Sequence, residues 1–279
     1  MIKLIATDLD GTLLLPDHVS VSDENARALR AASEQGIRIV IASGRTHEVF
    51  PAGVRELEFI DYALTSNGSS LMIFDTKTGE PKEQRSVTEM PCDVWNFVYD
   101  SMVSAGADPE VYACGKSFMD AEMGDRYGSG LLPDALVAEL KSHITFVDDV
   151  KETLVGKSAE KVCALTVPEE NRASLMAVLE NDGRLEITSA IPGNIEVNLK
   201  GTSKGRAIAM LCDMLGIMPD EVMAFGDADN DVEMLKYAGF SVAMGNAKDE
   251  AKAVCRYVTE TNENDGVAKA IYKYAIKPE

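Results

Sequence analysis

The sequence predicts an α/β protein built on a largely parallel sheet, with a second unit of α+β type inserted into it. Stretches of strand and helix character alternate over about the first 80 residues and again after residue 192, which is the pattern of βαβ units. The interval between them contains paired strands mixed with helices. A chain of 279 residues has room for about two domains.

The first part of the chain alternates strand and helix in the order that parallel strands require. Residues 2–7 are apolar and predict a short strand, and Ser22 can cap a helix that stops at Gly36. Residues 37–45 (IRIVIASGR) form a β-branched run without alternation, as expected for a strand covered on both faces. Residues 62–70 (YALTSNGSS) predict the next strand. Together these segments predict a doubly wound sheet.

The middle and last parts of the chain differ from each other in pattern. We expect an antiparallel hairpin and then helices mixed with short strands in the segments 70–87, 92–105, around 111 and 118, after 133, 160–167, 168–181, 184–190 and 194–199. The α/β pattern resumes with the segments 203–216, 222–231 and 240–247 and ends in a helix. We therefore expect residues 1–83 and 192–279 to form the core and residues 84–191 the inserted α+β unit.

Composition excludes several classes of function. The formal net charge of −19 argues against nonspecific nucleic-acid binding, which needs clustered Lys and Arg, but it does not exclude a small phosphorylated metabolite as the partner. The five scattered cysteines contain no C-x-x-C pair, which indicates reduced thiols. No apolar run approaches the roughly 20 residues of a membrane span, and no signal peptide is recognisable. We expect a cytoplasmic protein, either a monomer or a homodimer.

Asp8 and Asp10 directly follow the first predicted strand and are candidates for catalysis. Residues i and i+2 of an extended segment face the same side, so both carboxylates can face one reacting centre. Two close acids repel each other, which favours a metal ion or different protonation states. Mg²⁺ prefers oxygen ligands, and Asp227 supplies a further carboxylate from another strand end. For an isolated D-x-D, a solvated loop or a helix cap is the alternative.

An oxygen-rich site beside Mg²⁺ suits phosphoryl transfer. Asp8 is then the nucleophile that forms an aspartyl-phosphate and also a metal ligand. Asp10 acts as general acid to the leaving oxygen and then as general base to water. Gly11 lets the backbone turn tightly, so that N–H groups near Leu9 and Asp10 can face a phosphate.

Other polar residues follow predicted strands or begin a helix, and parallel sheets bind ligands at that edge. Ser43 offers a hydroxyl, and Gly44 permits close approach of its N–H. Lys204 lies at a predicted helix start, where anions are favoured. Asn230 can donate an amide N–H to phosphate. Asp231 can orient Lys204 or a metal-bound water.

Two residues near these motifs have simpler interpretations. Asp229 is expected to face solvent. Arg45 can contact a substrate, or it can pair with a carboxylate of the core.

The motifs that carry these residues resemble those of the haloacid dehalogenase (HAD) superfamily, specifically the Cof-type, subclass IIB phosphatases. They are DLDGTLL (8–14), SGR (43–45), SKG (203–205) and GDADND (226–231). Further likenesses are SNGS (66–69), AMGNA (243–247) and NDGVA (264–268). The resemblance spans the chain and implies a Rossmann-like parallel-sheet core with an inserted α+β cap of C2 type that sets substrate specificity.

The same resemblance implies roles for individual residues. Asp8 is the nucleophile, Asp10 the acid and base, and Mg²⁺ is held by Asp8, Asp227 and the backbone carbonyl of Asp10. The residues expected to bind phosphate or substrate are Leu9, Thr12, Ser43, Gly44, Arg45, Lys204 and Asn230. Ser43 stands where the family often has Thr, but the hydroxyl is retained.

The function that follows is Mg²⁺-dependent hydrolysis of small phosphate monoesters, such as sugar phosphates or related metabolites. One alternative is a phosphomutase of the same superfamily, which would share all four motifs. The other is a non-catalytic phosphoester-binding protein, which degraded motifs would mark. Asp8 and Asp10 are both intact, which favours the hydrolase.

Overall fold

The computed structural model describes residues 1–75, 78–128, 134–189 and 193–276. The chain divides into two compact units. The core unit comprises Met1–Arg45, Phe50–Val87 and Ser203–Glu279, and the inserted unit comprises Thr46–Val49 and Thr88–Thr202. The α/β fold class predicted from the sequence is confirmed.

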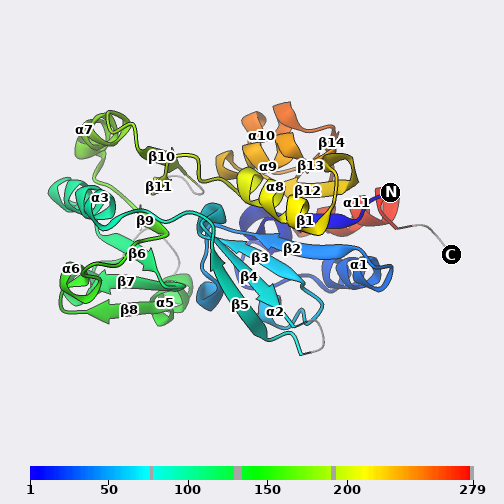
Figure 1. The fold of residues 1–279 in the computed structure, drawn as a ribbon, viewed down its shortest axis with the longest axis horizontal. Coiled ribbons are helices and arrows are strands. Elements are labelled where there is room, and N and C mark those ends of the chain that lie inside the picture. Colours follow the sequence, from blue (N-terminus) through cyan, green and yellow to red (C-terminus); the bar gives the residue numbers. More distant parts are fainter. Residues whose placement is uncertain (76–77, 129–133, 190–192, 277–279) are drawn as a thin grey trace. The chain divides into compact units, whose positions relative to one another are not determined.

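The core unit is built on an eight-stranded sheet with the strand order β14-β13-β12-β1-β2-β3-β4-β5 (Figure 1). From β14 to β3 the neighbouring strands are parallel, and β3, β4 and β5 pair antiparallel. All residues of β1 are buried, as expected for a strand covered on both faces. The strands are β1 (Leu4–Thr7), β2 (Arg38–Ala42), β3 (Tyr62–Thr65), β4 (Ser70–Phe74), β5 (Pro81–Ser86), β12 (Val222–Gly226), β13 (Phe240–Ala243) and β14 (Tyr257–Val258).

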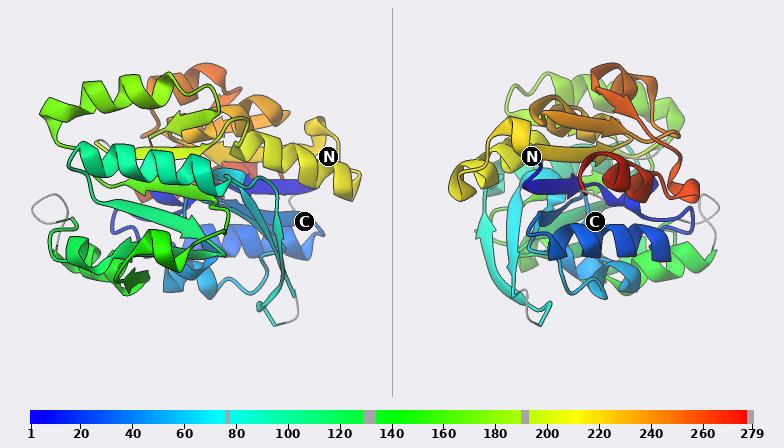
Figure 2. Two further views of the ribbon diagram at one scale, coloured as in Figure 1. Left: turned by 60° about the vertical axis from the view of Figure 1, so that its left-hand side comes forward. Right: turned by 90° about the vertical axis from the view of Figure 1, so that its right-hand side faces the viewer.

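Helices flank this sheet (Figure 2). They are α1 (Asp23–Glu34), α2 (Ala52–Arg55), α8 (Lys204–Leu215), α9 (Val232–Tyr237), α10 (Asp249–Val254) and α11 (Gly266–Tyr274). α1 packs against α11, and α8 packs against α9. Ser22 caps α1 as the sequence predicted, because its Oγ accepts a hydrogen bond of 3.1 Å from the N–H of Asn25.

The inserted unit contains a six-stranded sheet with the order β10-β11-β9-β6-β7-β8. Its strands are β6 (Pro109–Ala113), β7 (Lys116–Asp120), β8 (Ile144–Val147), β9 (Lys161–Ala164), β10 (Leu185–Thr188) and β11 (Ile195–Leu199). Its helices are α3 (Cys92–Ser104), α4 (Ala121–Gly124), α5 (Asp134–Ser142), α6 (Val150–Thr153) and α7 (Glu169–Glu180). Trp95 of α3 belongs to a separate apolar core together with Val111 and Val162 of the sheet.

The division between the units lies at other residues than the sequence suggested. The predicted inserted unit spanned residues 84–191, whereas the compact unit runs from Thr88 to Thr202. The later end has a clear cause, since β11 pairs with β9 and β10. The hairpin of β4 and β5 extends the core sheet through β3.

None of the described helices has the length and apolar character needed to span a bilayer.

Close contact between α8 and α9 generates a first prediction. A Cβ added at Gly205, in the first turn of α8, would overlap the backbone of Glu233 and lie 2.8 Å from the N atom of Met234. Gly205→Ala should therefore lower the free energy of unfolding by about 1–3 kcal/mol, the usual cost of overpacking, although Ala favours helices over Gly. Chemical denaturation measures the change. The exposed position Asp213 on the same helix provides the control, Asp213→Ala, and a Gly205→Ala protein as stable as wild type would contradict the packing argument.

Candidate active site

Two adjacent parallel strands end in aspartates at the same edge of the core sheet. β1 and β12 pair in register with Thr7 opposite Phe225, so Asp8 and Asp227, which follow shortly after, lie close together. The N–H of Asp8 continues the ladder by donating to the carbonyl of Phe225 over 3.1 Å. Ligands of open α/β sheets bind beyond this carboxyl edge, which makes the two strand ends a candidate site.

The loop after β1 is shaped around the carboxylate of Asp227. Leu9–Leu13 form a single wide turn, with Gly11 at a φ of +74°. A Cβ at Gly11 would overlap that carboxylate, since it would lie 2.8 Å from Cγ of Asp227. The buried hydroxyl of Thr12 donates to Oδ1 of Asp227 over 2.8 Å. Glycine is therefore needed at position 11 for close approach as well as for its φ, and Thr12 orients a carboxylate.

Lys204 lies inside the site as a fully buried cation. Ser203 caps α8 by accepting a hydrogen bond from the N–H of Arg206, which places Lys204 as the first helical residue. Its Nζ lies 2.7 Å from Oδ1 of Asp8 and 2.7 Å from Oδ1 of Asp231. Both carboxylates are buried as well, so the lysine balances charge that water cannot reach.

Asp231 is itself held by the backbone. Its Oδ2 accepts hydrogen bonds from the N–H of Asp227 over 2.9 Å and of Ala228 over 3.1 Å. Oδ1 binds Lys204, so each of its oxygens has a donor. Asp231 therefore orients Lys204, one of the two roles that the sequence left open.

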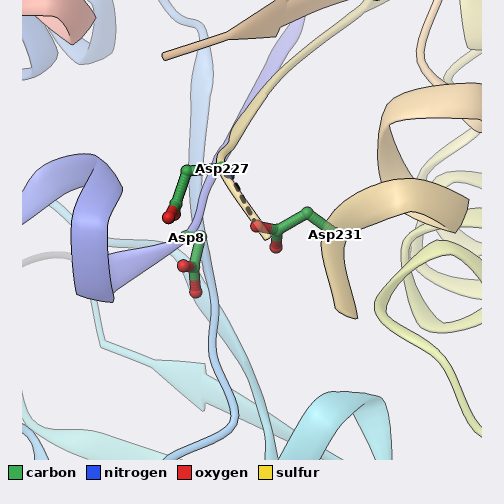
Figure 3. A group of neighbouring side chains, drawn as sticks. All are labelled: Asp8, Asp227 and Asp231. Atoms are coloured by element: carbon green, nitrogen blue, oxygen red, sulfur yellow. Dashed lines mark hydrogen bonds between the residues drawn. The ribbon is translucent and has the colours of Figure 1, made fainter. Parts of the chain in front are cut away.

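Three carboxylates converge at this point (Figure 3). Ligand atoms of Asp8, Asp227 and Asp231 all lie within 4.8 Å of one another. Burial, followed by the charge of Asp231, raises the pKa of Asp8 well above its ordinary value, against the opposing effect of Lys204. Burial and Asp231 likewise raise the pKa of Asp227 to about 7. The negative charge of the cluster thus exceeds what one lysine neutralises.

This cluster fits a hard divalent cation. Among the described residues, no hydrogen bond occupies Oδ2 of Asp8 or of Asp227. Carboxylate oxygens are the ligands that Mg²⁺ and similar ions prefer, and a bound cation would favour the ionised forms that burial disfavours. Asp231 is the least available of the three because its oxygens already accept hydrogen bonds. Asp8 and Asp227 are therefore the side chains suited to hold the ion.

The carboxylate of Asp10 has two other partners, Arg45 and His18. Arg45 donates from Nε to Oδ2 over 2.9 Å and from Nη2 to Oδ1 over 2.6 Å, a bidentate pair. Nδ1 of His18 lies 2.8 Å from the same Oδ1. Burial alone would raise the pKa of Asp10, but the charge of Arg45 and the hydrogen bonds from His18 and Arg45 outweigh it and lower the pKa well below its usual range. Asp10 is thus held as a carboxylate.

The remaining predicted site residues lie around this centre in the core unit. Ser43 is buried at the end of β2, and its Oγ accepts a hydrogen bond from the N–H of Arg45 over 3.1 Å. Gly44 lies between them and is half-buried, and Leu9 is fully buried. Asn230 is buried, and its Nδ2 donates to Oδ1 of Asn67 over 3.2 Å, while its own Oδ1 has no partner within the described part of the chain.

Sequence reasoning missed two residues of the site. Neither His18 nor Asn67 was among the candidates, although both adopt positive φ, +59° and +60° respectively. Asn67 lies in the SNGS motif, whose Asn-Gly pair was available as a signal. Arg45 pairs with the carboxylate of Asp10, and pairing with a carboxylate was one of the two interpretations of this residue. Asp229 is exposed and binds Lys248.

Comparisons with known proteins identify the family of the chain. Residues 5–271 match the family described as haloacid dehalogenase-like hydrolase. The 5-amino-6-(5-phospho-D-ribitylamino)uracil phosphatase YcsE of Bacillus subtilis is 32% identical over 275 residues, covering 99% of this chain and 96% of that protein. The pyridoxal phosphate phosphatase YbhA of Escherichia coli is 28% identical over 281 residues, covering 98% of this chain and 99% of that protein.

Solved structures show the same likeness. A haloacid dehalogenase-like hydrolase from B. subtilis superposes with a TM-score of 0.84 at 27% identity, covering 99% of this chain and 100% of that one. The HAD subclass IIB sugar phosphatase BT4131 superposes with a TM-score of 0.79 at 25% identity, with the same coverage.

The hydrogen bond from Thr12 to Asp227 generates a second prediction. Thr12→Val removes the donor that orients this carboxylate while keeping the shape of a fully buried side chain. Affinity for Mg²⁺, measured by titration calorimetry, should fall by about 10–100-fold, as is typical when a residue that orients a metal ligand is lost. Thr12→Ser keeps the hydroxyl and should bind Mg²⁺ nearly as wild type does. Equal affinity in the Val variant would show that Thr12 does not support a cation site.

Proposed function

This chain belongs to the haloacid dehalogenase-like hydrolase family, and we propose that it hydrolyses small phosphate monoesters with Asp8 as the nucleophile. One observation supports this proposal most strongly. The buried carboxylate of Asp8 lies at the end of β1, where its Oδ1 is 2.7 Å from Nζ of Lys204. Together with Asp227 it belongs to the group of carboxylates that could hold a metal ion. A carboxylate in that setting can attack phosphorus, because its surroundings supply the positive charge that a phosphate dianion needs.

In the first step a carboxylate oxygen of Asp8 bonds to phosphorus while the bond from phosphorus to the ester oxygen breaks. The ester oxygen leaves with a proton from Asp10, so the alcohol departs neutral and Asp10 becomes a carboxylate. Lys204 stays beside Asp8 and offsets the charge of the transferred group. Arg45 and His18 favour the carboxylate of Asp10, so the acid acts from the minor, protonated form.

In the second step a water oxygen bonds to phosphorus and the bond from phosphorus to Asp8 breaks. Asp10, now the base, takes a proton from that water, and inorganic phosphate and the free carboxylate of Asp8 result. This step uses the form of Asp10 that its partners favour. The side chain of Asp10 is 27% exposed, so water can reach it.

The ion in this proposal is Mg²⁺, and Asp8, Asp227 and the backbone carbonyl of Asp10 would hold it. When present, it supplies positive charge that keeps Asp8 ionised and draws electrons from the phosphoryl oxygens. The excess of carboxylates over cations in the cluster supports this assignment.

The phosphate itself would be held by groups that surround Asp8 in the core unit. These are the N–H of Leu9, the hydroxyl of Ser43, the N–H of Gly44, Lys204 and the side chain of Asn230. Asn230 would donate to phosphate from Nδ2, whose two hydrogens allow a second bond beside the one to Oδ1 of Asn67. The inserted unit would act as the cap that selects among small phosphorylated metabolites, in a cytoplasmic enzyme.

Phosphate release from a panel of esters tests the proposal. The panel contains sugar phosphates, pyridoxal phosphate and a phosphoribitylamino-pyrimidine, since the relatives are named for such substrates. Release should require Mg²⁺, stop when EDTA removes the ion, and return when Mg²⁺ is restored. A folded protein that binds Mg²⁺ and yet releases phosphate from no member would contradict the proposed function.

Replacing the nucleophile is the sharpest mutational test. Asp8→Asn keeps the size of the side chain but cannot form the acyl phosphate, so turnover should fall by roughly 10³-fold or more, as when other enzymes lose a nucleophile. Asp229→Asn is the matched control, because Asp229 lies in the same motif but is exposed. Circular dichroism establishes that both variants fold. Turnover near wild type in Asp8→Asn would eliminate the assignment.

A further inference from the structure

His18 occupies a backbone conformation that needs an explanation. Its φ of +59° lies in the left-handed region, which is uncommon for a residue with a Cβ, although asparagine, aspartate and histidine adopt it more often than other such residues. Such strain persists only where the surrounding structure enforces it, and it often occurs at functional sites. The position calls for a reason to retain histidine.

The surrounding loop enforces that conformation. Leu14 and Val21 form an antiparallel bridge that closes the loop. Within it, the N–H of His18 donates to the carbonyl of Leu15 over 2.9 Å. Oδ1 of Asp17 accepts from the N–H groups of Val19 at 2.9 Å and Ser20 at 2.8 Å, an arrangement typical of aspartate in turns. The loop therefore presents the ring of His18 in one place.

That place is beside the carboxylate of Asp10. Nδ1 of His18 lies 2.8 Å from Oδ1 of Asp10, and Nη2 of Arg45 also donates to the carbonyl of His18 over 3.2 Å. An ionised carboxylate only accepts hydrogen bonds, so Nδ1 must carry the hydrogen. Arg45 and His18 together therefore fix the rotation of the Asp10 carboxylate, with Arg45 on both oxygens and His18 on one.

We infer that His18 is a positioning residue for the second step, in which it holds the carboxylate of Asp10 toward the water that attacks the phosphorylated Asp8. The inference rests on the proposed function and adds to it a residue that none of the sequence motifs contains. Without the Nδ1–H donor, Arg45 is the one described side chain that still binds the Asp10 carboxylate, and the carboxylate spends less time directed at the water. Formation of the aspartyl-phosphate from an ester with a good leaving group does not need this proton transfer and is not affected.

Two substitutions distinguish the effect of the Nδ1–H donor from the effect of the backbone conformation at position 18. His18→Gly keeps the positive φ but removes the donor. His18→Asn also accepts positive φ, and its side-chain amide places an N–H near the position of Nδ1. If the donor is what matters, the asparagine variant restores what the glycine variant loses.

Rapid-mixing kinetics with 4-nitrophenyl phosphate test the inference, because its leaving group departs without a proton. In His18→Gly, kcat should fall by about 10–100-fold, less than the roughly 10²–10⁴-fold that a full general base contributes, since Arg45 remains. The ratio kcat/KM should stay within about threefold of wild type, because it reports only the steps up to the first irreversible one. A burst of about one equivalent of 4-nitrophenolate per site should appear as the aspartyl-phosphate accumulates. His18→Asn should recover most of kcat and lose the burst.

Each other outcome overturns the role of His18. Unchanged kcat in His18→Gly would show that the donor is dispensable, and a parallel fall of kcat and kcat/KM without a burst would show general damage to the site. An asparagine variant as slow as the glycine variant would show that the Nδ1–H bond is not the cause. A wild-type protein that hydrolyses neither this ester nor any of the panel contradicts the proposed function itself.

Discussion

The arrangement of the site depends on the buried ammonium group of Lys204. It contacts Asp8 at the end of β1 and Asp231 beyond β12, and it lies 196 residues away from Asp8 along the chain. None of the three side chains is more than 7% exposed, so each would be costly to bury alone. Removing one partner of such a buried pair typically costs about 3–5 kcal/mol because an uncompensated charge remains. The lysine therefore ties the first and last segments of the core unit into one site.

Backbone shape makes this concentration of charge attainable. Gly11 lets the carboxylate of Asp227 lie against the loop after β1, and Gly205 lets the first turn of α8 approach α9. Because α9 follows Asp231 directly, the contact at Gly205 brings Lys204 to its second carboxylate. Gly11 and Gly205 thus permit the close approach that brings the charged residues beside them together. This explains why DLDGT and SKG contain small and ionic residues together.

Much of this could be predicted from local sequence, and the rest depended on contacts between distant segments. The β-branched run of β2 and the capping serine of α1 are local signals, and the structure has both elements where they were expected. The end of the inserted unit was placed too early: the strand predicted at 194–199 is β11, which pairs with β9 in the inserted sheet, and a strand pattern alone does not tell which sheet the strand joins. His18 was missed because its importance arises from its contact with Asp10, which no sequence motif indicates. Thr12 was expected at the phosphate, but its hydroxyl faces Asp227.

Phosphorylation of Asp8 is the step on which the proposed reaction depends, and chemical trapping detects it. The protein is mixed with a substrate and Mg²⁺, quenched within one turnover and reduced with borohydride, which converts an acyl phosphate of aspartate to homoserine. Peptide mass spectrometry then locates the modified residue. We expect homoserine at position 8 and unmodified aspartate at positions 10, 227 and 231. Modification at another residue, or none while phosphate is being released, would contradict it.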